Sequence, residues 1–246
     1  MTVFAQQLYQ LLDVTSLNNT DNEKVIQKLI EDVLSTKGRL NIAPAAICVY
    51  PNFAKLVSRQ LNNTSIKTAV VASAFPHGQA STDIKATEIY KAVEDGAQEI
   101  DVVLNRGLAT QGNWDYVEME ISLFRDVSRS RTLKVILETC ELNAEQIEMA
   151  TQICLRNEVD FVKTSTGKGL KGAELESSRL ILELIRAQFE KTGRRTGFKA
   201  AGGIRTEEDA RTYWNLVRET LGPDWLDAKY FRIGASSLVE NLLNQI

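Results

Sequence analysis

The sequence is poor in the residue types that build metal and disulfide sites. It contains one histidine, His77, and three cysteines, Cys48, Cys140 and Cys154, among 246 residues. Catalytic zinc sites commonly use two or three histidine ligands, so a metal enzyme built on histidine is excluded. An odd number of cysteines without Cys-x-x-Cys spacing favours a reduced, cytoplasmic protein over a disulfide framework. We therefore expect a cytoplasmic protein with no metal site.

Long hydrophobic runs and a charge excess are also missing. The most apolar stretches, Asn41–Ala54 and Thr68–Ser81, are interrupted by Pro44, Pro51 and Pro76 and are shorter than the roughly 20 residues of a membrane span. The first residues lack the basic region and cleavage pattern of an export signal. With 29 Lys and Arg against 32 Asp and Glu, the net charge is −3, which is not the basic footprint of a nucleic-acid-binding protein. We expect a soluble protein with neither membrane nor nucleic acid as a partner.

What the sequence does contain is a repeated alternation of β-rich runs and amphipathic helical patterns. The predicted strands are Leu11–Thr15, Ala45–Tyr50, Thr68–Phe75, Glu99–Leu104, Leu133–Glu138, Phe161–Ser165, Gly197–Ala201 and Tyr230–Gly234. The predicted helices are Asn22–Thr36, Asn52–Leu61, Ser81–Asp95, Trp114–Val127, Ala144–Arg156, Leu175–Lys191, Glu207–Leu221 and Ser237–Gln245. Eight strands each followed by a helix, with no linker, predict one (β/α)₈ TIM barrel over residues 1–246. A doubly wound dinucleotide-binding sheet is disfavoured because no Gly-x-Gly-x-x-Gly follows the first strand.

Capping residues mark the ends of several predicted helices. Start signals are Thr20, Asn143 and Thr206, each close to acidic residues that suit a first helical turn. Stop signals are the glycines Gly38, Gly96, Gly193 and Gly222.

Two predicted strands carry a lysine between apolar neighbours. Lys163 lies in the sixth strand and Lys199 in the seventh. Desolvation and a like-charged neighbour would both lower the pKa of a lysine inside the barrel mouth. The amine would then be neutral, as Schiff-base chemistry requires. The competing interpretation for Lys163 is a surface lysine in a strand of different register.

Carboxylates occupy comparable positions in other strands. Asp101 interrupts a β-branched run, where a carboxylate needs a partner that an inward lysine would supply. It is either a general acid or base beside the amine or half of a structural ion pair. Asp13 has the same pattern and either joins this network or orients it, with the structural, supporting role favoured, and Glu138 is a weaker case.

The last three strand-to-helix loops are rich in glycine and hydroxyl residues. Glycine lets backbone N–H groups approach an anion, a helix N-terminus adds free donors, and barrels often bind phosphate after strands seven and eight. The candidate phosphate-binding residues are Thr166, Gly167, Lys168, Gly202, Gly203, Arg205, Gly234, Ser236 and Ser237.

Two further residues have ordinary explanations. His77 is expected to be a loop histidine rather than a catalyst. Cys48 ends the second strand, where it either borders the pocket or packs as a small core residue.

Eight segments together resemble the deoxyribose-phosphate aldolase family, whose members are class I aldolases. They are LLDVTSL (11–17), AAICVYP (45–51), FPHG (75–78), EIDVV (99–103), LKVILET (133–139), DFVKTSTGK (160–168), GFKAAGGIRT (197–206) and RIGASSL (232–238). Their order and their spread over nearly the whole chain make this resemblance far more specific than any single motif.

The resemblance implies reversible cleavage of 2-deoxy-D-ribose 5-phosphate into acetaldehyde and D-glyceraldehyde 3-phosphate. By similarity, Lys163 forms the Schiff base, Lys199 perturbs its pKa, and Asp101 transfers protons through water. No cofactor is implied, and the partner is a phosphorylated sugar, with a homodimer as the hypothesis for assembly. Alternatives are another Schiff-base sugar-phosphate aldolase, a transaldolase, or a non-catalytic sugar-phosphate-binding barrel.

The chain also departs from the family pattern. Ala200 follows Lys199 where many members have proline, and the sequence ends Leu243-Asn244-Gln245-Ile246 without the terminal tyrosine of some members. Proton transfer assisted by such a tail is therefore expected to be unavailable.

Overall fold

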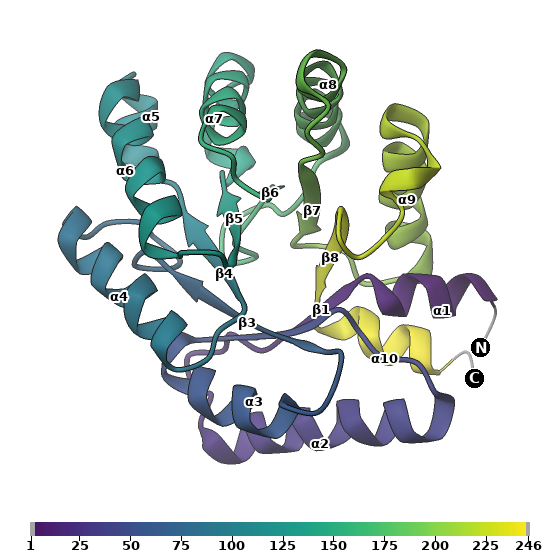
Figure 1. Cartoon of the computed structure of the whole chain (residues 1–246). Coiled ribbons are helices and arrows are strands. Elements are labelled where there is room, and N and C mark those ends of the chain that lie inside the picture. Colours follow the sequence, from purple (N-terminus) through teal and green to yellow (C-terminus); the bar gives the residue numbers. More distant parts are fainter. Residues whose placement is uncertain (1–2, 245–246) are drawn as a thin grey trace.

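Eight parallel strands form a closed barrel in the order β1 to β8, with β8 pairing back onto β1 (Figure 1). The computed structural model describes residues 3–244. The strands are β1 Leu12–Thr15, β2 Ala46–Val49, β3 Lys67–Ala72, β4 Glu99–Val103, β5 Thr132–Ile136, β6 Phe161–Lys163, β7 Gly197–Ala201 and β8 Phe231–Ala235. The predicted TIM barrel is therefore confirmed. Strands β3, β5 and β6 end earlier than predicted, at Ala72, Ile136 and Lys163. After β6, the hydroxyl of Thr164 bonds the backbone of Ala201.

Helices surround the barrel, and every predicted helix is present. They are α1 Val3–Gln10, α2 Glu23–Leu40, α3 Ala54–Leu61, α4 Thr82–Glu94, α5 Arg106–Thr110, α6 Trp114–Val127, α7 Ala144–Arg156, α8 Leu175–Thr192, α9 Glu207–Leu221 and α10 Ser237–Leu243, with 3₁₀ turns at Pro51–Phe53, Thr139–Glu141 and Pro223–Trp225. The last helix was predicted to reach Gln245, which lies outside the described residues. Helices α1 and α5 were not predicted. Each is short, and α1 is held by packing against α9 and α10, beside which it lies in Figure 1.

The predicted helix ends are partly right. Asn143 and Thr206 are the helix starts, as predicted, and the structure shows in addition that they form capping boxes with Gln146 and Asp209. Thr20 is wrong as a start signal. The side chain of Asn22 caps α2 instead, by accepting hydrogen bonds from the backbone N–H groups of Lys24 and Val25. Gly38 is wrong as a stop signal.

Helix α2 continues through Gly38 to Leu40 and ends at Asn41, which takes a left-handed conformation with φ 53°. Asparagine tolerates this conformation better than most residues, so a glycine was not needed there. Gly96, Gly193 and Gly222 do follow helix ends with positive φ.

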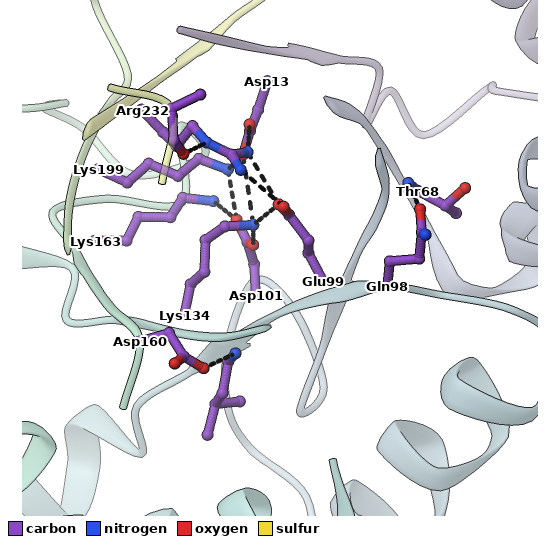
Figure 2. Close-up of polar contacts among 12 residues, drawn as sticks. Asp13, Thr68, Gln98, Glu99, Asp101, Lys134, Asp160, Lys163, Lys199 and Arg232 are labelled. Carbon is purple, nitrogen blue, oxygen red and sulfur yellow. Dashed lines mark hydrogen bonds and ion pairs between the residues drawn. The ribbon is translucent and has the colours of Figure 1, made fainter. Parts of the chain in front are cut away.

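The main hydrophobic core lies between the strands and the helices, whereas the barrel interior is largely charged. Outward strand residues such as Val70, Val102 and Val162 pack against helices in the main core. The interior holds a small apolar cluster on β2 and β3, made of Ala46, Cys48, Ala69 and Val71 with Leu17 above it. Elsewhere the interior holds lysine, arginine and carboxylate side chains (Figure 2), with the ring of Phe161 against Lys134 and Arg232. Within residues 3–244, no helix has the length and apolar character needed to cross a membrane.

Candidate active site

The two lysines predicted to face each other do so inside the barrel. Lys163 and Lys199 are register partners on β6 and β7. Both side chains are buried, with Lys163 only 3% exposed. Their ammonium nitrogens donate to the same oxygen, Oδ2 of Asp101, at 2.8 Å from Lys163 and 2.7 Å from Lys199 (Figure 2). The surface position considered for Lys163 is therefore wrong.

Asp13 belongs to the same network. Its carboxylate accepts from the amine of Lys199, from Nη1 of Arg232 at 2.6 Å, and lies 3.5 Å from the amine of Lys134. Asp13 and Asp101 thus hold Lys199 from two sides. Asp13 therefore joins the charged network, where it forms an ion pair with Lys199; its supporting role stays a prediction.

Three members of the cluster were missed by the sequence interpretation. Lys134 lies 2.7 Å from Glu99 and 2.8 Å from Asp101, and the guanidinium of Arg232 binds Glu99 through two nitrogens at 3.0 and 2.8 Å. A signal was available, because Glu99 lies two residues before Asp101 and shares its face of the strand. Lys134 repeats the pattern of Lys163, a lysine between apolar neighbours in a strand.

The cluster joins three carboxylates to four basic groups. Its members within the described residues are Asp13, Glu99, Asp101, Lys134, Lys163, Lys199 and Arg232. Buried charges are costly unless they are paired. Three of the basic groups can be balanced by the three carboxylates, and one is left over.

The directions of the pKa shifts identify the group left over. Burial lowers the pKa of Lys163, Asp101 raises it, and the charge of Lys199 lowers it, so that it lies below its usual value. Burial also opposes the charge on Lys134 and Lys199, but the carboxylates outweigh it and raise both pKa values. Basic neighbours hold the pKa values of Asp13, Glu99 and Asp101 below their usual range in spite of burial. Lys163 is the basic group most ready to lose its proton.

A cavity of about 240 Å³ opens above Lys163 at the carboxyl ends of the strands. Every predicted phosphate-binding residue lines it, together with Lys163; these are Thr166, Gly167, Lys168, Gly202, Gly203, Arg205, Gly234, Ser236 and Ser237. Thr15, Leu17 and Asn18 also line it and were not predicted. Asp101 and Lys199 lie beneath this lining, in the fully buried part of the barrel.

Glycine allows the two loops at this cavity to approach each other. Gly202 and Gly203 have φ values of 82° and 81°, a region that side-chain-bearing residues rarely adopt. A Cβ placed on Gly172 in the loop after β6 would lie 2.2 Å from the carbonyl carbon of Gly202. Any larger residue would push the loops apart and open the cavity.

Glu138 holds the loop after β6 from outside the cavity. Its carboxylate accepts from the hydroxyl of Thr166 and from the Thr166 backbone N–H at 3.2 Å, and the Thr166 hydroxyl accepts from the N–H of Lys168 at 3.0 Å. The donors of Thr166 are therefore occupied by Glu138. Thr166 contributes shape to the cavity, while the side chain of Lys168 remains as a charged donor there.

Cys48 and His77 lie outside this cavity lining. Cys48 packs in the apolar cluster on β2 and β3, and burial raises the pKa of its thiol to about 11. This is the behaviour of a small core residue. His77 is exposed in the turn after β3 and lines a separate cavity with Arg106 and Glu141.

Comparison with known proteins agrees with this geometry. The sequence model of the DeoC/LacD family aldolases matches residues 7–217. Deoxyribose-phosphate aldolases of Homo sapiens and Mus musculus are 40% and 39% identical over 96% of this chain and 78% of their own length. The solved structure of deoxyribose phosphate aldolase from Aeropyrum pernix superposes with a TM-score of 0.76 at 26% identity, covering 98% of this chain and 92% of that one. With a family match over most of its length and a charged barrel interior beneath a glycine-lined cavity, the chain belongs to the DeoC/LacD family of aldolases.

Proposed function

We propose that this aldolase reversibly cleaves 2-deoxy-D-ribose 5-phosphate into acetaldehyde and D-glyceraldehyde 3-phosphate through a Schiff base on Lys163. The observation that carries the proposal is the position of the Lys163 amine. It lies at the inner end of a cavity rimmed by glycine-rich loops, and among the described ion pairs it has a single carboxylate partner, Asp101. The similarity to deoxyribose-phosphate aldolases supports the choice of substrate.

The first step needs a neutral amine. The Lys163 nitrogen attacks the aldehyde carbon C1 of the open-chain sugar, and the carbinolamine loses water to give an iminium. The lowered pKa of Lys163 supports this role, because a larger fraction of the amine is then unprotonated near neutral pH.

The second step breaks the bond between C2 and C3. The C3 hydroxyl loses its proton, C3 becomes the aldehyde of D-glyceraldehyde 3-phosphate, and the bonding electrons move into the enamine at C2. Asp101 is the proposed base, acting through water, since its carboxylate bonds both Lys163 and Lys199 and lies beneath the cavity. The same relay returns a proton to C2, and hydrolysis releases acetaldehyde.

Lys199 is proposed to keep its proton throughout. Asp13 and Asp101 both bind its ammonium group, and their charges raise its pKa above the usual value in spite of burial. Its positive charge therefore stays beside the Lys163 amine and helps to keep that amine neutral.

The 5-phosphate is proposed to bind at the outer rim of the cavity. Lys168 and Arg205 supply positive charge there, and the backbone of Gly202 and Gly203 together with Ser236 and Ser237 supplies close donors. None of these groups contacts the buried cluster in the described structure, so phosphate recognition and amine chemistry occupy opposite ends of one cavity.

Borohydride trapping tests the proposal directly. The chain is incubated with limiting acetaldehyde, reduced, and mapped by peptide mass spectrometry. We expect an ethyl group on Lys163, because acetaldehyde forms an iminium on that amine and borohydride reduces the iminium to a stable secondary amine. Lys168 is the internal control, since it lines the same cavity and belongs to no described ion pair with Asp101.

A Lys163→Met variant should lose both the label and cleavage of 2-deoxyribose 5-phosphate while still binding the sugar phosphate. An unmodified Lys163 in an active chain would overturn the proposal. Binding of the sugar phosphate without any adduct would instead indicate a non-catalytic barrel.

We also propose that the protein is cytoplasmic and forms a homodimer. A cytoplasmic location agrees with three free cysteines, of which Cys48 and Cys154 are buried. A homodimer is tested by analytical ultracentrifugation of the purified chain, and a monomeric mass would contradict it.

A further inference from the structure

Arg232 and Glu99 form an ion pair at the amino-terminal end of the barrel, away from the cavity. The Nη1 and Nη2 atoms of Arg232 lie 3.0 and 2.8 Å from the two oxygens of Glu99. Arg232 is 5% exposed and Glu99 3%. Neither lines the cavity that holds Lys163. A sugar phosphate in that cavity would touch neither residue.

Two chains of contacts nevertheless connect this pair to the Lys163 amine (Figure 2). In the first, Glu99 binds Lys134 at 2.7 Å, Lys134 binds Asp101 at 2.8 Å, and Asp101 binds Lys163 at 2.8 Å. In the second, Arg232 binds Asp13 at 2.6 Å, Asp13 binds Lys199, and Lys199 donates to Asp101 at 2.7 Å. Both chains end on the carboxylate that holds Lys163.

The groups that surround Lys163 inside the barrel come from nearly every strand. They are Asp13 on β1, the Cys48 thiol on β2, Glu99 and Asp101 on β4, Lys134 on β5, Lys199 on β7 and Arg232 on β8, with Lys168 above them at the cavity. Strand β3 presents Ala69 and Val71 to this part of the interior. Its first residue, the exposed Lys67, lines a separate cavity at the amino-terminal end of the barrel, together with Lys37, Asp227, Lys229 and Arg232. With Lys163 neutral, the three carboxylates meet three cations, and the buried interior carries no net charge.

We propose that Arg232 and Glu99 are positioning residues that set the charge state of Lys163 from the opposite end of the barrel. Each supplies one unit of charge to a buried cluster, where an unbalanced charge is costly. The group nearest to the cavity, Lys163, then responds by holding or releasing its proton. This inference rests on the proposed function, in which the free amine of Lys163 is the nucleophile.

Charge-changing variants at the two positions should move Lys163 in opposite directions. Arg232→Met removes a cation and leaves three carboxylates against Lys134 and Lys199, so Lys163 should hold its proton to a higher pH. Glu99→Gln removes a carboxylate, so Lys163 should release its proton at a lower pH. The double variant removes one charge of each sign and should return Lys163 close to its native behaviour.

The measurement is the rate of iminium formation with acetaldehyde as a function of pH, trapped by borohydride and quantified on the Lys163 peptide. Acetaldehyde is used because it has no phosphate group to titrate. The acid limb of this profile reports the free amine. We expect the limb to move by about one pH unit in the alkaline direction for Arg232→Met and about one unit in the acidic direction for Glu99→Gln.

Arg232→Lys is the matched control, because it keeps the charge and loses the two-nitrogen contact with Glu99. Its acid limb should stay in place even where its stability falls. Should Arg232→Met fail to fold, the double variant replaces it, and its limb should lie on the alkaline side of that of Glu99→Gln.

If the acid limb lies at the same pH in the native chain and in all folded variants, and only the rates are lower, the inference is overturned and the pair has a structural role. Movement of the limb in Arg232→Lys as large as that in Arg232→Met would also overturn it. If the native chain traps no acetaldehyde on Lys163 at any pH, the proposed function itself fails. If the native chain traps acetaldehyde on Lys163 but the acid limbs of the variants do not move, only this inference fails and the proposed function stands.

Discussion

Lys163 and Lys199 donate to one oxygen of Asp101, yet the shifts of their pKa values have opposite signs. The difference lies in the number of carboxylates that each lysine contacts. Lys199 is held by both Asp13 and Asp101, whereas the described ion pairs of Lys163 involve Asp101 alone. Two carboxylates raise the pKa of Lys199 by more than its burial lowers it. Asp101, which Lys163 shares with Lys199, does not outweigh the effect of burial on the pKa of Lys163.

Replacing Lys199 with leucine should therefore raise the pKa of Lys163. A group whose pKa is lowered in the folded protein regains its proton when the cause is removed, so less free amine exists at neutral pH. We expect the acid limb of kcat/KM to move about one pH unit or more in the alkaline direction, with about a tenfold loss of activity at pH values below the limb. The measurement is kcat/KM against pH for both proteins.

Leucine leaves the burial of Lys163 in place, so the result separates its two causes. An unmoved acid limb with lower activity would show that desolvation alone lowers the pKa of Lys163. Lys199 would then act by orienting Asp101.

Ser237→Asp should discriminate between phosphorylated and unphosphorylated sugars. Ser237 lines the cavity rim, where an added carboxylate would repel a phosphate dianion. We expect kcat/KM for 2-deoxyribose 5-phosphate to fall by roughly 100-fold, while that for 2-deoxyribose changes little. Ser237→Ala is the control for lost hydroxyl contacts. Equal losses for both substrates would mean that the phosphate binds elsewhere.

Glu138→Gln should weaken phosphate recognition without touching the phosphate. The carboxylate of Glu138 holds the hydroxyl and the N–H of Thr166, and an amide replaces these charge-assisted bonds with weaker ones. We expect KM for 2-deoxyribose 5-phosphate to rise by roughly five- to tenfold, with kcat nearly retained. Glu141→Gln is the matched control, because Glu138 and Glu141 both form an ion pair with Arg106, at 3.4 and 2.9 Å. Glu141 is half exposed and bonds no loop residue after β6 in the described structure.

A rise in KM of the same size for unphosphorylated 2-deoxyribose would count against this role of Glu138. In that case the loop after β6 would shape the whole cavity rather than its phosphate end.

Lys85→Met tests a buried ion pair that is unrelated to the site. Lys85 binds both oxygens of Glu120 at 3.0 and 3.1 Å, joining α4 to α6. Removing the lysine leaves a buried carboxylate with the Thr82 hydroxyl as its remaining described partner, which should lower the free energy of unfolding by about 3–5 kcal/mol. Denaturant unfolding measures this loss, and kcat/KM of the folded variant should stay unchanged. The double variant Lys85→Met, Glu120→Leu should recover most of the stability, and failure to do so would indicate a packing defect instead.

Much of the fold followed from local sequence patterns. Alternation of apolar residues predicted the strands and helices around the barrel, and the capping boxes at Asn143 and Thr206 depend only on residues three apart. The errors at Thr20 and Gly38 are local choices between neighbouring candidates. The missed helix α1 is different, because its eight residues are stabilised by packing on α9 and α10 rather than by their own propensity.

The sequence by itself determined which residue types stand at the ends of the strands, and hence the lysine pair and the phosphate-type loops. Only the tertiary structure decided how their charges are paired. Lys134, Glu99 and Arg232 enter the cluster because strand register pairs β4 with β5, and barrel closure places β8 across the interior from them. Contacts between residues as far apart in sequence as Asp13 and Arg232 carry no local signal. The protonation of Lys163 depends on the sum of those contacts, because charges in a buried interior interact over the whole cluster and not only with their nearest partner.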